Sequence, residues 1–221
     1  MAAEAGEGEA EAGDAEGSAQ TTEGAPGADA AAAEAELGEI ERAVKGCMLC
    51  RLHETRKQAV FARGRNDAEI MIVGEGPGGD EDKQGIPFVG RAGKLLDEMV
   101  SAMGLARDDV YITNIVKCRP PKNRDPRADE IDACWPYLER QIELVRPRVI
   151  ITLGRPSSNT LLQRDSAMKD LRGRWFSFKG VPLLPTYHPA YLLRSPRQKR
   201  AVWDDLRKVI LALHGQGEVE V

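Results

Sequence analysis

The sequence contains little of what marks several large classes of protein. Aromatic residues make up only 5% of its 221 residues, and there are three histidines and four cysteines. No apolar run approaches the roughly 20 residues that a membrane-spanning helix needs. The first residues have neither the basic and apolar regions of a secretory signal nor the arginine-rich composition of a transit peptide. We therefore expect a protein of the cytoplasm that does not associate with membranes.

Residues 1–38 differ in composition from the rest of the chain. They contain ten acidic residues, no basic or aromatic ones, and consist mostly of alanine, glutamate and glycine. Such a segment buries too little apolar surface to offset its ordering entropy, so it predicts a disordered acidic tail before a single domain at 39–221. Because the whole chain has a formal charge of −4, residues 39–221 carry +6. That charge suits a polyanionic partner, although it is also common in ordinary domains.

Short apolar runs alternate with segments of helical periodicity after residue 39. The expected strands are 70–73, 110–115, 149–153 and a hairpin of 175–178 with 181–184. The expected helices are 39–45, 91–103, 128–145, 156–163 and 196–213. This alternation predicts an α/β domain with a mostly parallel sheet between helices. Glu75, Asn114 and His188 each follow or end a strand, which places them at the carboxyl edge where ligands bind.

The segment Gly74-Glu-Gly-Pro-Gly-Gly79 matches the dinucleotide-binding pattern GxGxxG only formally. That motif needs a helix directly after the glycines and an acidic residue about 20 positions on, at the end of a second strand. Here the sequence predicts a long loop from Asp80 to Gly90, and Asp97 and Glu98 fall within a helix. We therefore expect no nucleotide cofactor.

The four cysteines suggest a metal site. Cys47 and Cys50 form a CxxC pair, whereas Cys118 and Cys134 are separated by fifteen residues. A protein kept reduced rarely uses four cysteines for disulfides, and four thiolates can hold zinc or a [4Fe–4S] cluster. Zinc ribbons usually have two close pairs, so the spacing favours the cluster, with zinc or no metal as alternatives.

Several motifs together resemble those of the uracil-DNA glycosylase superfamily, and most closely the family 4 enzymes, the thermostable type that carries an iron–sulfur cluster. The matching segments are GEGPG at 74–78, GIPFVGRAG at 85–93, YITN at 111–114, KCRP at 117–120 and HPA at 188–190. Each motif is weak alone, but their joint order and spacing over about residues 39–213 are specific.

The resemblance implies a fold, a cofactor and an activity. The fold would be a three-layer α/β/α arrangement with a central four-stranded, mostly parallel sheet. The four cysteines would bind a [4Fe–4S] cluster. The chain would be a monomeric enzyme of base excision repair that hydrolyses the N-glycosidic bond of uracil in single- or double-stranded DNA, leaving an abasic site. The alternatives are a non-catalytic DNA-binding or damage-sensing module of the same fold, and an iron–sulfur or zinc protein that binds nucleotides.

The resemblance also implies roles for individual residues. Glu75 and His188 would be catalytic, the first activating or orienting water and the second facing uracil O2. Phe88 would stack on the flipped base, and Asn114 would read its polar edge. The other residues expected to line the pocket are Gly74, Gly76, Gly78 and Glu81, the last where a thymine methyl group is excluded. Four of these residues also have a purely structural explanation. Phe88 could be an ordinary core residue, Asn114 a turn at a strand end, His188 part of loop packing and Glu75 a solvated carboxylate.

Two positions distinguish this sequence from other relatives of the family 4 enzymes. Family 5 relatives lack an acidic residue at the position of Glu75, which favours family 4. Some relatives bind uracil-DNA irreversibly through a histidine in a basic loop after the second strand. The matching stretch here, 121–126, contains no histidine, so we expect turnover.

Two basic clusters flank the expected site and would contact phosphates. They comprise Arg119, Lys122, Arg124 and Arg127, and then Arg194, Arg197, Lys199 and Arg200. Leu192 or Leu193 would insert into the gap that the flipped base leaves.

Overall fold

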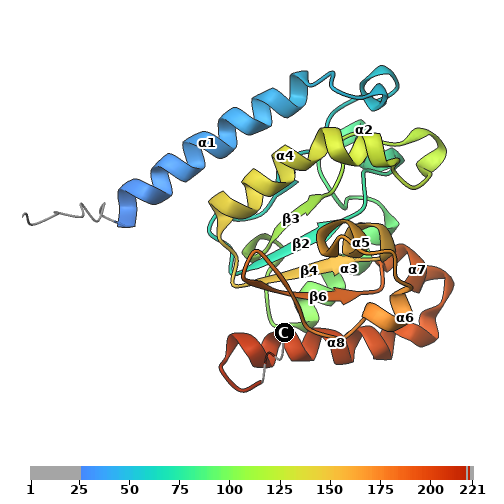
Figure 1. Cartoon of the computed structure of the whole chain (residues 1–221). Helices are drawn as coiled ribbons and strands as arrows, with labels where there is room; N and C mark the ends of the chain where they lie inside the picture. Colours follow the sequence, from blue (N-terminus) through green and yellow to red (C-terminus); the bar gives the residue numbers. More distant parts are fainter. Residues whose placement is uncertain (1–25, 218, 220–221) are drawn as a thin grey trace, which may run out of the picture.

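A computed structural model describes residues 26–217 and 219 (Figure 1). Over these residues the sheet has six strands in the order β1-β3-β2-β4-β6-β5. The four central strands are parallel, and the two edge strands are antiparallel to their neighbours. The strands are β1 (Ala62–Arg63), β2 (Ile70–Gly74), β3 (Tyr111–Asn114), β4 (Val149–Leu153), β5 (Phe176–Phe178) and β6 (Val181–Thr186). The mostly parallel sheet is confirmed, whereas the count of four strands is wrong because both edges carry one more.

Eight α-helices and four short 3-10 turns complete the described part of the chain. The helices are α1 (Pro26–Gly46), α2 (Gly79–Gln84), α3 (Arg91–Ala102), α4 (Ala128–Val145), α5 (Arg155–Leu162), α6 (Met168–Leu171), α7 (Pro189–Arg194) and α8 (Lys199–Leu213). The turns are η1 (Arg51–Glu54), η2 (Arg107–Asp109), η3 (Pro121–Asn123) and η4 (Pro196–Gln198). Within the described part, no helix is both long and apolar enough to cross a membrane.

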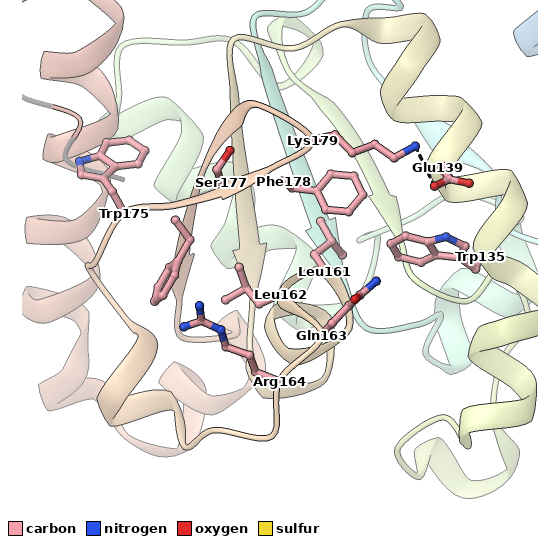
Figure 2. A pocket seen from close by; sticks show the side chains of 11 residues that line it. Trp135, Glu139, Leu161, Leu162, Gln163, Arg164, Trp175, Ser177, Phe178 and Lys179 are labelled. Carbon is pink, nitrogen blue, oxygen red and sulfur yellow. Dashed lines mark ion pairs between the residues drawn. The ribbon is translucent and has the colours of Figure 1, made fainter.

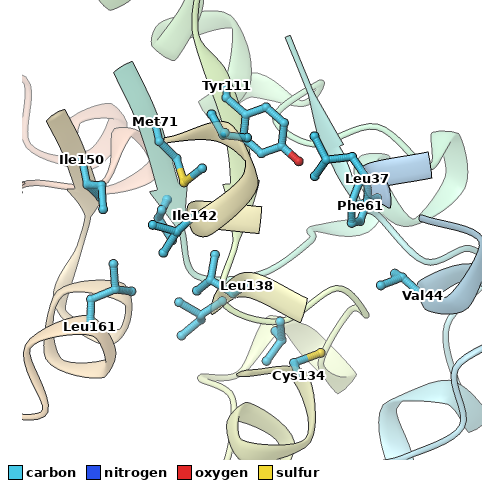
Figure 3. Close-up of a cluster of buried hydrophobic side chains, with 14 of the residues drawn as sticks. Leu37, Val44, Phe61, Met71, Tyr111, Cys134, Leu138, Ile142, Ile150 and Leu161 are labelled. Carbon is cyan, nitrogen blue, oxygen red and sulfur yellow. The ribbon is translucent and has the colours of Figure 1, made fainter. Parts of the chain in front are cut away.

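Two hydrophobic cores lie on opposite faces of the sheet, which confirms the three-layer α/β/α arrangement. Met71 and Val73 of β2 point to the face covered by α1, α4 and α5, and the core on that face includes Leu37, Leu138 and Leu161 from these helices (Figure 3). The alternate residues Ile70 and Ile72 point to the face covered by α3, α7 and α8. Because the parallel strands are buried on both faces, they read in the sequence as continuous apolar runs.

Helix α1 overturns part of the expected domain boundary. The composition predicts disorder through residue 38, but residues 26–38 belong to this helix. Alanine and glutamate are strong helix formers, and the later turns of α1 bring Leu37 and Val44 into the core, 3% and 1% exposed. Glu36 also accepts two hydrogen bonds from Arg140 of α4, at 2.6 and 2.7 Å. Residues 1–25 of the expected tail lie outside the described residues.

Helix α2 overturns the long loop expected after the glycine segment. It begins at Gly79 and ends at Gln84, where the expectation was irregular chain as far as Gly90. Its six residues are almost all polar, so they carry no helical pattern of apolar residues. The helix argument against dinucleotide binding is therefore wrong. The acidic criterion still fails, because Asp97 sits on α3 and pairs with Arg63 and Arg107.

Candidate active site

The carboxyl ends of the parallel strands bring three polar side chains to one edge of the sheet. Gly74 at the end of β2 lies opposite Asn114 at the end of β3, and Glu75 follows Gly74 directly. The end of β4 pairs with Thr186 of β6, two residues before His188. Parallel register therefore places the acid, the amide and the imidazole on the same edge, as the strand pattern predicts.

Phe88 joins this edge from the loop between α2 and α3. The centroids of its ring and the His188 ring are 5.7 Å apart, with a 30° angle between the planes. A Cβ atom on Gly74 would lie 2.6 Å from Cζ of Phe88 and would also collide with Oδ1 of Asn114. Only glycine fits between the ring and the amide. The structure thus brings Gly74, Phe88, Asn114 and His188 together.

The side chain of Asn114 presents an unused acceptor. The residue is 2% exposed, and among the described residues no donor reaches its Oδ1. Buried acceptors are almost always paired, because an unpaired one costs about 1–3 kcal/mol. An acceptor left open beside an aromatic ring points to a ligand that supplies the missing N–H.

The hydrogen bonding of His188 fixes which nitrogen carries its proton. The backbone N–H of Ala190 donates to Nδ1 at 3.1 Å, so Nδ1 is unprotonated and the proton lies on Nε2. Burial, with a smaller contribution from Arg194, lowers the pKa of His188 to about 4. The imidazole is therefore neutral near pH 7 and offers Nε2–H as a donor.

The pKa of the Glu75 carboxyl group lies close to neutral pH. Burial, with a smaller contribution from the charge of Asp125, raises the pKa of Glu75 to about 7. Its backbone carbonyl accepts a hydrogen bond from Val116 at 3.2 Å, which ties the glycine segment to the chain after β3. Gly76 approaches the same segment so closely that a Cβ would lie 2.8 Å from Cγ2 of Val116. A carboxyl group with this pKa can accept a proton from water near neutral pH.

Glu81, on α2, faces the loop that carries Phe88. Its Oε1 accepts hydrogen bonds from the backbone N–H groups of Val89 and Gly90, at 2.9 and 2.8 Å. A Cβ on Gly78 would lie 2.7 Å from Oε2 of the same carboxylate. Glu81 is therefore bound to backbone beside the site.

Comparison with known proteins agrees with this geometry. A family model described as the Uracil DNA glycosylase superfamily matches residues 61–207, a span that contains every residue of the edge described above. The chain belongs to the uracil-DNA glycosylase superfamily. The α/β fold is consistent with this membership, and the resemblance carried by the sequence motifs is confirmed.

Three similar proteins are all named type-4 uracil-DNA glycosylases. A "Type-4 uracil-DNA glycosylase" of Saccharolobus solfataricus is 49% identical over 179 residues, 77% of this chain and 83% of the relative. One from Sulfurisphaera tokodaii is 46% identical over 182 residues, 78% and 83% of the two chains. One from Thermotoga maritima is 45% identical over 180 residues, 78% and 93% of the two chains.

The four cysteines of this superfamily member line one small cavity. Cys47 and Cys50 are partly exposed after α1, whereas Cys118 and Cys134 are each 4% exposed and belong to the core. Arg56 donates to Sγ of Cys118 at 2.9 Å, and the backbone N–H of residue 117 donates to Sγ of Cys134 at 3.5 Å. Burial raises the pKa of Cys134 to about 11. In the described part of the chain, no group of three or more metal-ligand side chains is arranged to hold a single ion.

Lys117 belongs to the KCRP segment of the family resemblance, but no role was expected for it. It is 1% exposed, and its Nζ donates to the carbonyl of Asn114 at 2.8 Å and to Gln141 and Thr113 at 2.6 Å each. Lysines are almost always exposed, so neither composition nor periodicity signals this position. Lys117 links the strand end that carries Asn114 to helix α4 and the adjoining cysteine cavity.

The residues expected to contact DNA have different surroundings. Arg194, Arg197, Lys199 and Lys122 are exposed, and Arg119 is partly exposed with its Nε bound to Asn123. Arg124 forms two hydrogen bonds to buried Glu130, at 2.5 and 2.8 Å. Leu192 is 1% exposed in the core against α3 and α8, so the expectation that it reaches DNA is wrong. Its neighbour Leu193 is 38% exposed and is the leucine that can make that contact.

A separate hollow lies between α4, α5 and β5 (Figure 2). Trp135, Leu161 and Phe178 form its apolar wall, and an ion pair of 2.8 Å joins Lys179 to Glu139 at its rim. None of the residues of the carboxyl-edge site lines it.

Proposed function

We propose that the chain is a DNA-repair enzyme that removes uracil from DNA by hydrolysing its N-glycosidic bond. One observation carries this proposal: the open Oδ1 of Asn114, buried beside the ring of Phe88. Its relatives in the superfamily are named for the same activity. We further propose that residues 39–221 form the glycosylase domain and that the part of α1 before residue 39 packs on it through Leu37.

The pocket recognises an extruded uracil by stacking and hydrogen bonding. A base inside a duplex is out of reach, so the nucleotide must flip out at a cost of a few kcal/mol. Stacking on Phe88 returns on the order of 1–3 kcal/mol. Oδ1 of Asn114 accepts from uracil N3–H, and its amide N–H₂ donates to O4. Cytosine presents the opposite donors and acceptors, so it leaves buried polar groups unpaired and is rejected.

Bond cleavage leaves negative charge on the departing uracil and positive charge on the sugar. The Nε2–H of neutral His188 donates to O2 and stabilises the leaving anion, a contribution of about 3–4 kcal/mol for one well-placed donor. Glu75 accepts a proton from the attacking water, and its negative charge favours the sugar cation. Glu75 and His188 are therefore the catalytic residues of this proposal.

We propose that Cys47, Cys50, Cys118 and Cys134 hold a [4Fe–4S] cluster. The donor set fits, because all four thiols face one cavity and two of them already receive N–H hydrogen bonds, which tune such clusters. The cluster would cross-link the chain after α1 to the loop after β3 and to α4.

DNA would lie across the carboxyl edge of the sheet. We propose that the exposed cations Lys122, Arg194, Arg197 and Lys199, together with Arg119, contact phosphates, and that Leu193 enters the gap left by the flipped base. Arg124 would contribute less, because Glu130 already binds it. The enzyme is expected to act as a monomer.

Base release from an oligonucleotide with one deoxyuridine tests the proposed function. After incubation the strand should become alkali-labile at that site, whereas strands with thymidine or deoxycytidine in its place should stay intact. Tight binding of the deoxyuridine strand without product would support the non-catalytic alternative instead. Absence of both binding and product would overturn the assignment.

A further inference from the structure

The backbone of Phe88 adopts a conformation that a large side chain rarely takes. Its φ is +54°, in the left-handed region, and the residue is 6% exposed. Such a conformation carries strain and persists only where the surrounding structure imposes it. The contacts that impose it therefore set where the ring lies.

Three contacts hold the turn at Phe88. The Oε1 atom of Glu81 accepts from the N–H groups of Val89 and Gly90, the two residues that follow the ring. On the other side, the backbone of Phe88 packs against Gly93 of α3 so closely that a Cβ there would collide with its carbonyl. Arg107 donates to that carbonyl at 3.4 Å. Of these, the carboxylate makes the two shortest polar contacts.

We propose that Glu81 is a positioning residue for uracil excision, and that it acts by holding the turn that places the Phe88 ring beside Asn114 and His188. The inference rests on the proposed function. This task differs from excluding a thymine methyl group, because the Oε1 atom of Glu81 binds two backbone N–H groups of the protein rather than the base. Only the accepting oxygen matters for this task.

Two substitutions at Glu81 separate its oxygen from its charge. Glu81→Ala removes the acceptor and should lower the single-turnover rate of uracil release on the order of 10- to 100-fold, the loss that a misplaced binding group produces. Glu81→Gln keeps an oxygen at the same reach and should stay within about 5-fold of the unsubstituted enzyme. Glu98→Ala removes an exposed carboxylate from α3 and serves as the control with an unchanged rate. A loss in Glu81→Gln as large as in Glu81→Ala would overturn the proposal.

A double-mutant cycle shows whether Glu81 acts through the ring. In a Phe88→Ala background there is no ring to place, so adding Glu81→Ala should lower the rate less than about 2-fold further. A general loss of structure would lower the rate equally in both backgrounds, and such additivity would overturn the proposal. It would also fall if Glu81→Ala released thymine while its uracil rate stayed unchanged.

Amide hydrogen exchange tests the contact without any DNA. The N–H groups of Val89 and Gly90 should exchange faster in Glu81→Ala than in Glu81→Gln, measured on peptides covering residues 85–95. Equal exchange in the two variants would overturn the proposal. If the unsubstituted enzyme released no uracil at all, the proposed function would fail, and this measurement would still decide whether Glu81 holds the turn.

Discussion

The carboxyl-edge site and the cysteine cavity are built in opposite ways. At the edge, contacts within the chain hold two of the side chains: the backbone N–H of Ala190 donates to His188, and Glu81 binds the turn that carries Phe88. In the cavity, Cys47 and Cys50 lie on a partly exposed segment, and the N–H···S contacts reach only Cys118 and Cys134. We infer that contacts within the chain preorganise the first site, and we propose that a bound cluster stiffens the second.

This contrast predicts which property each region controls. Changes at the edge should alter the rate of uracil release with little effect on stability. Changes in the cavity should alter metal content and stability, and the rate only through the folded fraction. Lys117 contacts both regions, since its Nζ donates to the Asn114 carbonyl and its backbone N–H donates to Sγ of Cys134.

Asn114→Ala should have the largest effect on the rate. Removing the amide takes away both hydrogen bonds that read uracil, so we expect single-turnover release to fall at least about 100-fold. The melting temperature should stay nearly constant, because Oδ1 has no partner in the described structure to lose. The measurement is product formation from a deoxyuridine strand, with melting followed in parallel. Asn66→Ala, in an exposed loop, is the control, and full activity in Asn114→Ala would mean that the site is wrongly placed.

The pH dependence should be the next largest effect. Glu75 must be deprotonated to accept a proton, and its pKa is raised to about 7. The single-turnover rate should therefore rise about tenfold per pH unit below pH 7 and level off above it. His188, with a pKa of about 4, stays neutral over this range and adds no second limb.

Two variants sharpen the pH prediction. Glu75→Gln should be slow and nearly independent of pH. Asp125→Asn removes a negative charge that raises the pKa of Glu75, so the midpoint of the profile should move to lower pH. An unshifted midpoint in Asp125→Asn, or a steep profile in Glu75→Gln, would assign the titration to another group.

Cys134→Ser should act mainly on stability. Loss of one ligand should remove most of the bound iron and, through several kcal/mol of lost stabilisation, lower the melting temperature by roughly 10 °C. Uracil release well below that temperature should fall only a few-fold. Iron and sulfide analysis with thermal unfolding measures both. The control is Met48→Ser, an exposed residue between Cys47 and Cys50, and full iron content in Cys134→Ser would exclude this cysteine as a ligand.

The sequence predicted those features that follow from apolar periodicity and from strand ends. The run Ile70–Val73 and the helical spacing of 128–145 each gave an element within a residue of its observed bounds, because burial dictates both patterns. Helix α2 and strand β1 were missed because six polar residues and two strand residues carry no such pattern. Residues 26–38 are helical because alanine and glutamate favour a helix and Leu37 packs into the core, although a single buried leucine gives the sequence no apolar periodicity there.

The parts of the site that sequence could not give depend on three-dimensional contacts. The strand pattern placed Asn114 and His188 at one edge, but the approach of the Phe88 ring depends on the turn between α2 and α3, which no local pattern encodes. The left-handed backbone conformation of Phe88 also could not be predicted from sequence, because it depends on contacts with Glu81 and Gly93 in the neighbouring helices. The burial of Lys117 could not be predicted either, because lysine side chains are almost always exposed.

The pair Leu192 and Leu193 gives a small expected change in rate and separates an effect on the rate from an effect on stability. Leu193 is exposed, so Leu193→Ala should leave melting unchanged and lower release from duplex DNA about 5-fold, with little effect on single strands, which need no wedge. Leu192 is buried in the core, so Leu192→Ala should lower the free energy of unfolding by about 2–5 kcal/mol, with no change in the ratio of duplex to single-strand rates. The ratio, measured for both variants well below their melting temperatures, identifies the residue that enters the duplex. A lowered ratio in Leu192→Ala alone would mean that α7 leaves its core position when DNA binds, and the edge would then be less preorganised than its contacts indicate.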